Sequence, residues 1–205
     1  MNVLLINGSP HPKGCTHTAL SEIEKVLQRH KIETTRFHIG RKAIHGCIAC
    51  RKCQKTGKCV FQDNANTCAD LIRKADALVV GSPVYYASAN GALCALLDRV
   101  FFSAGQDFRN KPAAAIVSCR RGGASAAFDR LNKYFTISEM PVVSSLYWNA
   151  VHGNTPEEVA QDAEGMQVMR TLGRNMAALL ENLKTGKSKI PSEKREARVM
   201  TNFIR

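Results

Sequence analysis

Short apolar segments and amphipathic segments alternate along most of the chain, and this alternation restricts the fold more than any other feature. The apolar segments have the length and composition of buried strands, and the others have the spacing of one-faced helices. We expect strands at 3–8, 32–39, 76–83, 112–118 and 141–146. We expect helices at 16–30, 67–75, 91–104, 124–137 and 156–184. Such alternation predicts a parallel sheet covered by helices on both faces.

The number of segments then defines the fold class. Five strands and about as many helices predict an α/β fold with a flavodoxin-like, doubly wound, five-stranded parallel sheet in three α/β/α layers. The 205 residues suit one domain, which we place at 1–184, followed by a basic C-terminal tail at 185–205. In such sheets the ligand binds at the carboxyl ends of the strands, where the strand order reverses.

The loop after the first strand, NGSPHPKGCTHT, has the composition of an anion site. It offers hydroxyls, a lysine and no carboxylate, and it opens onto a helix N-terminus that attracts phosphate. It is neither a G-x-G-x-x-G fingerprint nor a Walker loop. An ordinary capped turn would explain one Thr and one Gly but not this density. We therefore predict a mononucleotide phosphate site that includes Ser9, Pro10, Lys13, Cys15, Thr16, His17 and Thr18.

Two further loops follow the third and fourth strands. The first, SPVYYAS, offers a stiff turn and aromatic faces to a flat ring, although two packing tyrosines would look alike. The second, SCRRGGAS, offers arginines for an electron-rich ring edge, although a solvated turn is the alternative. The predicted ring contacts are Pro83, Val84, Tyr85, Tyr86, Ser118, Cys119, Arg120 and Gly123.

Four cysteines lie close together at Cys47, Cys50, Cys53 and Cys59. The N-terminus lacks the features of a signal peptide, and no apolar run is long enough to cross a bilayer. We therefore expect a cytoplasmic protein with reduced thiols and no membrane partner. The spacing is typical of the compact ligand sets of cubane clusters, and a zinc site would be cramped. A [4Fe–4S] cluster, a zinc site and four thiols without a metal stay open as alternatives.

The net charge of +12 is concentrated in two segments. Residues 41–58 carry six Lys or Arg and no Asp or Glu, and the remaining excess is largely at 184–205. Residues 46–59, which hold the four cysteines, include no aromatic residue on which a base would stack, so we expect no nucleic-acid partner. A positive field there would stabilise an anionic cluster and attract an anionic cosubstrate such as a nicotinamide dinucleotide.

Several segments resemble one known family. SPHPKGCTHTAL is similar to the FMN phosphate loop of the NADPH-dependent FMN reductases, and GSPVYY followed by LLDR is similar to their isoalloxazine loop and next helix. The resemblance extends to YWNAVHG and the last long helix. The four cysteines resemble the compact motif of the iron–sulfur flavoproteins in this family, which bind FMN and a [4Fe–4S] cluster. One departure is Cys94-Ala95, where many relatives have a lysine.

The resemblance implies an FMN-dependent oxidoreductase that takes electrons from NAD(P)H or a reduced carrier and passes them to a small-molecule or protein acceptor. It also implies a homodimer or homotetramer. The flavin performs the chemistry, so we assign no catalytic residue. One alternative is an electron carrier that accepts electrons from ferredoxin and has no nicotinamide site. A remote alternative is a nucleic-acid-binding module built on a zinc knot.

Overall fold

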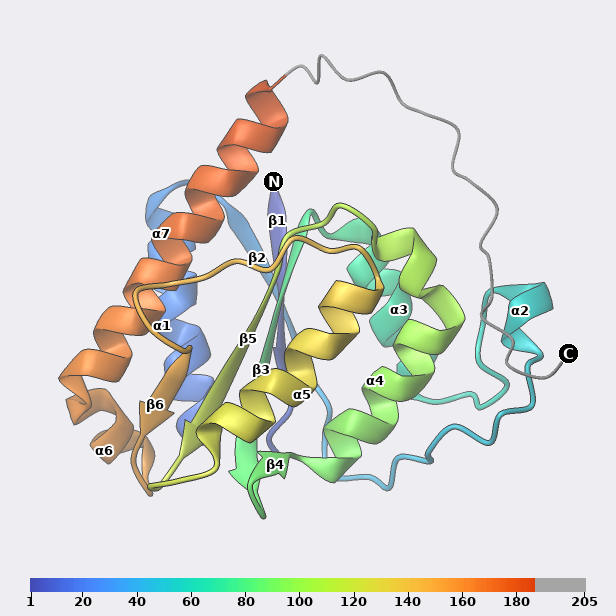
Figure 1. Ribbon diagram of the computed structural model, residues 1–205, viewed down its shortest axis with the longest axis horizontal. Coiled ribbons are helices and arrows are strands. Elements are labelled where there is room, and N and C mark those ends of the chain that lie inside the picture. Colours follow the sequence, from blue (N-terminus) through green and yellow to red (C-terminus); the bar gives the residue numbers. More distant parts are fainter. Residues whose placement is uncertain (187–205) are drawn as a thin grey trace, which may run out of the picture.

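The computed structural model describes residues 1–186, which form three layers (Figure 1). The central sheet has five parallel strands in the order β2-β1-β3-β5-β6, and β4 pairs antiparallel with the end of β3. The strands are β1 (Asn2–Asn7), β2 (Glu33–His38), β3 (Ala77–Tyr85), β4 (Ser88–Ala89), β5 (Ala113–Cys119) and β6 (Ala150–His152). This is the doubly wound, flavodoxin-like order that the alternation predicts.

Helices cover both faces of the sheet. In Figure 1, α1, α6 and α7 lie on one side, and α3, α4 and α5 lie on the other. The helices are α1 (Cys15–Arg29), α2 (Cys53–Thr56), α3 (Asn64–Lys74), α4 (Gly91–Ala104), the 3₁₀ turn η1 (Gly105–Phe108), α5 (Ala124–Ile137), α6 (Pro156–Gln161) and α7 (Ala163–Thr185). Because strand side chains alternate, Leu4 and Ile6 belong to one apolar core while Val3 and Leu5 belong to the other.

The fifth parallel strand is β6, and the prediction of a strand at 141–146 is wrong. That segment makes a single isolated bridge, from Val142 to Ala113, and Val142 is 41% exposed. The chain joins the sheet edge later, where the Asn149 side-chain amide donates to the Ala115 carbonyl oxygen at 3.0 Å. The β-branched pair at 142–143 favours a strand, but pairing at an edge depends on tertiary context more than on propensity.

The single closing helix predicted for 156–184 is two helices, α6 and α7. Asp162 separates them with a ψ of 86°, outside the helical range. Its carboxylate accepts the backbone N–H of Gly165 at 2.9 Å and that of His152 at 2.7 Å. The Asp162 carboxylate therefore caps α7 and connects the first turn of α7 to the end of β6.

Two parts of the chain lie apart from these layers. The segment between β2 and α3 carries the four clustered cysteines and the short helix α2, which lies beyond α4 in Figure 1. The basic tail predicted for 185–205 lies outside the described residues except for Thr185, which ends α7, and Gly186. Of the helices in residues 1–186, none is both long and apolar enough to cross a membrane.

Candidate functional site

A cleft of about 720 Å³ lies at the carboxyl ends of β1, β3 and β5. This is the edge at which doubly wound sheets bind their ligands. The volume is in the range of cofactor pockets. The cleft is lined by Ser9, His11, Pro12, Lys13, Gly14, Cys15, Thr16, Pro83, Val84, Tyr85, Ser118, Cys119, Arg120, Gly153, Asn154 and Pro156.

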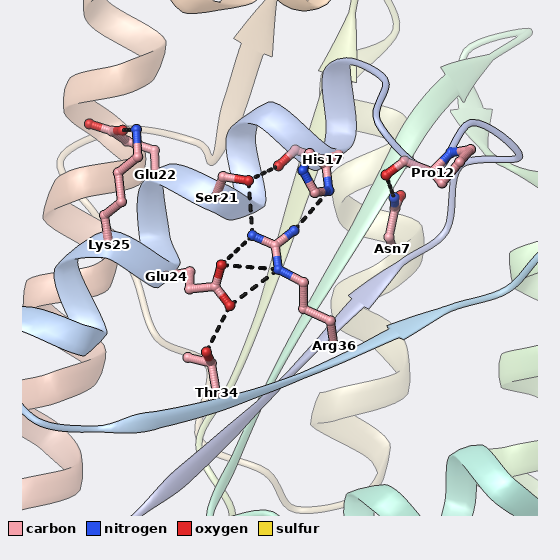
Figure 2. Close-up of polar contacts among 9 residues, drawn as sticks. All are labelled: Asn7, Pro12, His17, Ser21, Glu22, Glu24, Lys25, Thr34 and Arg36. Atoms are coloured by element: carbon pink, nitrogen blue, oxygen red, sulfur yellow. Dashed lines mark hydrogen bonds and ion pairs between the residues drawn. The ribbon is translucent and has the colours of Figure 1, made fainter.

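Hydrogen bonds hold the loop between β1 and α1 in one conformation. The Asn7 side chain accepts the backbone N–H of Ser9 at 3.0 Å, and its amide donates to the Pro12 carbonyl oxygen at 3.4 Å (Figure 2). The Ser9 hydroxyl accepts the N–H of His11 at 3.1 Å. On β2, His38 Nε2 lies 2.7 Å from the Ser9 carbonyl oxygen. The loop is therefore ordered before any ligand arrives, which lowers the entropic cost of binding.

The same loop presents positive partial charge to the cleft. Gly14 precedes the first turn of α1, and no side chain caps that turn, so its backbone N–H groups are available to an anion. The Thr16 hydroxyl lies 2.9 Å from that of Ser118, which brings hydroxyls from α1 and β5 together. Of the residues that the structure describes, Lys13 and Arg120 also line the cleft, and no Asp or Glu does. This wall is suited to a phosphate group.

The opposite wall comes from the hairpin between β3 and β4. Val84 and Tyr85 line the cleft, whereas Tyr86 is fully exposed. Tyr86 and Ala87 have φ values of 49° and 57°, so both residues at the tip of the hairpin adopt the left-handed conformation. That conformation is unfavourable for residues with a side chain and persists only where the surroundings require it. The hairpin packs against Gly123, which precedes α5.

Gly123→Ala is expected to lower the free energy of unfolding by about 1–3 kcal/mol and to displace this hairpin. Gly123 has a φ of 84°, and a Cβ there would lie 2.6 Å from the Cα of Ala87. Gly122→Ala is the matched control because its Cβ would meet no atom within 4 Å. Urea denaturation of both variants measures the difference. Equal stability of the two would contradict this packing.

The cleft brings together ten of the fifteen residues predicted to bind a cofactor. Pro10, His17, Thr18, Tyr86 and Gly123 do not line it. The Pro10 carbonyl oxygen accepts a hydrogen bond from Arg41 Nε at 3.1 Å. His17 and Thr18 line a separate cleft between α1 and the α6–α7 region.

His17 belongs to a polar network between α1 and β2 (Figure 2). Arg36 on β2 donates from Nη1 to His17 Nδ1 at 2.8 Å, and its Nε lies 3.0 Å from Glu24 Oε2. Because a guanidinium only donates, Nδ1 accepts and the ring proton belongs on Nε2. Burial, followed by the charge of Arg36, lowers the pKa of His17. The network joins α1 to β2 with a neutral histidine.

Sequence reasoning missed one side of the cleft, formed by Gly153, Asn154 and Pro156. These residues follow β6, and the misplaced fifth strand kept them away from the predicted ligand edge. The sequence carries a signal for this loop, because VHGNTP has a glycine two residues after the β-branched Val151 and a helix start at the proline. A fifth strand predicted at 150–152 would have placed the loop that follows it beside the loops after β1, β3 and β5.

The four clustered cysteines line one small cavity, which shares no residue with the cleft. Cys47 and Cys50 are exposed, and Cys53 and Cys59 are partly buried. Burial raises the pKa of Cys53, and the neighbouring thiols of Cys50, Cys47 and Cys59 raise it further. In the described part of the chain, no group of three or more His, Cys, Asp or Glu is already arranged to bind a metal ion. The four thiols share a cavity without forming a closed ligand set.

The other cysteines lie elsewhere and have different surroundings. Cys68 is fully buried in the core, which raises its pKa to about 12. Burial also raises the pKa of Cys15 and that of Cys119, both in the cleft. Thiols with raised pKa values are weak nucleophiles at neutral pH. Covalent chemistry by Cys15, Cys68 and Cys119 is therefore disfavoured.

Solved structures with the same fold include flavin proteins. RosB, solved with 8-demethyl-8-formylriboflavin-5'-phosphate, superposes with a TM-score of 0.72 at 14% identity, covering 100% of this chain and 94% of RosB. A flavodoxin from the domain Archaea superposes with a TM-score of 0.60 at 14% identity, covering 88% of this chain and 99% of that one. At these identities the likeness shows the fold alone, which is flavodoxin-like.

Sequence comparison identifies the family. An iron–sulfur flavoprotein of Methanocaldococcus jannaschii is 30% identical over 192 residues, which cover 90% of this chain and 100% of the relative. An iron–sulfur flavoprotein of Archaeoglobus fulgidus is 29% identical over 87% of this chain and 96% of its own length. Residues 1–155 match the family described as NADPH-dependent FMN reductase. These matches extend over the cleft and the cysteine segment, and the chain belongs to the NADPH-dependent FMN reductase family.

Proposed function

We propose that this oxidoreductase binds FMN in the cleft at β1, β3 and β5 and transfers electrons from NADH or NADPH to an acceptor. The observation that carries the proposal is the ordered loop after β1, with free helix N–H groups, paired hydroxyls and no carboxylate. Family membership supports FMN as the cofactor and oxidoreduction as the reaction class. When bound, FMN supplies the redox chemistry, and the chain supplies its position and surroundings.

The two walls of the cleft suit the two ends of FMN. Ser9, Thr16 and the first turn of α1 would hold the phosphate, because hydroxyls and free N–H groups donate to its oxygens. Val84 and Tyr85 would contact the flat ring system. Arg120 lies on the cleft wall and would place positive charge near that ring. We assign no side chain an acid or base role.

We further propose that Cys47, Cys50, Cys53 and Cys59 hold a [4Fe–4S] cluster. Four thiols that line one cavity are the donor set such a cluster needs, because soft thiolates favour iron–sulfur centres. The exposed Arg51, which also lines that cavity, would offset part of the negative charge of the ligated cluster. When bound, the cluster supplies one-electron transfer. The names of the relatives support this assignment.

The test of the electron donor is an anaerobic titration of the purified protein with NADPH or NADH. We expect a slight excess of nucleotide to bleach the flavin absorbance, because a hydride carries the two electrons that FMN accepts and the proposed cluster takes up one more. Dithionite is the control that shows the flavin to be reducible. Bleaching by dithionite but by neither nucleotide would contradict the proposed nicotinamide donor.

A second candidate function is an electron carrier that a ferredoxin-like protein reduces. It is favoured by the exposed cations around the cysteine cavity, which include Arg51, Lys52, Lys55 and Lys58 and would attract an acidic protein. The same titration separates the two functions, because a carrier is bleached by reduced ferredoxin and not by NADPH. Cytoplasmic location, a homodimer or homotetramer, and the lack of nucleic-acid and membrane partners stay predictions.

A further inference from the structure

Arg99 is a buried cation whose position the proposed function leaves unexplained. It lies on α4, its side chain is 1% exposed, and it is among the largest fully buried side chains of the described chain. Burying a guanidinium is costly unless each of its N–H groups finds an acceptor. The acceptors that Arg99 finds therefore indicate what this residue is for.

Within the described residues, the partners of Arg99 all come from the segment between β2 and α3, which carries the four clustered cysteines. Its Nη1 and Nη2 donate to the two carboxylate oxygens of Asp63, each at 2.7 Å, and Nη1 also donates to the His45 carbonyl oxygen at 3.2 Å. Its guanidinium carbon lies 4.9 Å from the centre of the Phe61 ring. Its Nε donates to the sulfur of Cys59 at 3.2 Å. Arg99 thus joins a core helix to both ends of the segment that carries the cysteines.

Cys59 is the most firmly held of the four clustered cysteines. Its backbone N–H donates to the side-chain oxygen of Asn66 at 2.9 Å, and its carbonyl oxygen accepts from the Asn66 amide at 3.0 Å. Within residues 1–186, it is also the one clustered cysteine whose sulfur accepts a hydrogen bond from another side chain. Cys47 and Cys50, by contrast, lie exposed on the loop.

We propose that Arg99 is a positioning residue for the cluster: it fixes Cys59 as a preformed ligand and donates to its sulfur, which raises the reduction potential of the cluster. The inference rests on the proposed cluster. A thiolate that ligates iron keeps lone pairs for an N–H donor. Such a bond stabilises the reduced, more negative cluster more than the oxidised one, so hydrogen bonds to sulfur tune these potentials.

The test is a redox titration of the cluster, followed by electron paramagnetic resonance, in anaerobically purified wild type, Arg99→Lys, Arg99→Gln and Arg73→Gln. Arg99→Lys keeps the positive charge but loses the fork that reaches Asp63 and Cys59 together. Arg73→Gln is the matched control, because Arg73 Nη2 donates to the Gly57 carbonyl oxygen at 3.1 Å and so holds the same segment without touching a sulfur. Iron per chain is measured on each protein.

We expect both Arg99 variants to titrate at a more negative midpoint potential than wild type, and Arg73→Gln to titrate with wild type. If Arg99→Gln does not fold, the midpoint potential of Arg99→Lys alone decides the test. An Arg99 variant that carries a full cluster at the wild-type potential would overturn the role of Arg99 and leave the proposed function intact. Wild type with bound flavin but no iron would overturn both this inference and the cluster, while FMN binding would stand.

Discussion

Asp63→Ala is expected to lower the free energy of unfolding by about 3–5 kcal/mol, the range for removing one partner of a buried charge. The loss is large because Arg99 stays buried after its counter-charge is gone. The substitution also removes the N-cap of α3, where Asp63 Oδ1 accepts the N–H of Ala65 at 3.0 Å. Urea denaturation, with the slope of the transition checked for a change in the unfolded state, measures the effect.

Two controls separate the ion pair from other effects. Asp63→Asn keeps the N-cap oxygen, so its loss of stability reports the missing charge together with the hydrogen bond from Arg99 Nη1 to Oδ2. Asp70→Ala removes the carboxylate of a more exposed pair with Arg73 and is expected to cost about 0–1 kcal/mol. If Asp63→Ala were no less stable than Asp70→Ala, Arg99 would not depend on Asp63 as described.

The pH dependence of the same pair has a definite sign. The hydrogen bond from Arg99 is the main reason that the pKa of Asp63 lies below its ordinary value of 3.8. The stabilisation is therefore fully present above that value and is lost as the pH falls through the lower pKa of the folded state. We expect the difference in stability between wild type and Asp63→Ala to narrow over that acid range.

The second large effect concerns the cofactor: Ser9→Ala combined with Thr16→Ala is expected to weaken FMN binding by at least about 100-fold. Each hydroxyl would donate to the phosphate, and a hydrogen bond to a charged group is worth about 1.5–3 kcal/mol. Ser9 also accepts the His11 N–H, so its loss loosens the loop as well. Quenching of flavin fluorescence on titration of apoprotein with FMN measures the affinity.

Riboflavin and a neighbouring hydroxyl provide the controls. Riboflavin lacks the phosphate, so the double variant should bind it nearly as well as wild type does. Ser21 lies on α1, as Thr16 does, but lines the separate cleft with His17. The FMN affinity of Ser21→Ala should therefore equal that of wild type. A double variant that keeps wild-type FMN affinity would place the phosphate elsewhere.

Much of the fold follows from local sequence pattern. Helices α4 and α5 have the bounds that their apolar spacing predicts, and β1 to β3 differ from their predicted bounds by a few residues. The errors in the predicted bounds arise where tertiary contacts, and not local sequence pattern, determine the secondary structure. Val142 lies in a strand-like segment that makes one bridge, and Asp162 breaks a continuous helical pattern because its carboxylate binds two backbone N–H groups.

The candidate site likewise has parts that the sequence predicts and parts that depend on tertiary contacts. The loops after β1, β3 and β5 could be placed in one cleft, because the carboxyl ends of parallel strands meet at one edge of the sheet. The contribution of Gly153 and Asn154 depended on locating β6. The bond from Arg99 to Cys59 joins residues 40 apart in the chain, and no spacing rule connects them. Read locally, LLDR is simply the middle of a largely apolar helix.

The visible absorption spectrum of protein purified without oxygen, recorded before and after adding FMN, tests the central claim most directly. We predict two flavin bands with bound FMN, riding on a broad absorbance from the cluster that dithionite bleaches. Flavin bands alone would remove the cluster and keep the FMN cleft. A colourless protein that does not take up added FMN would contradict the assignment of the cleft and, with it, the proposed function.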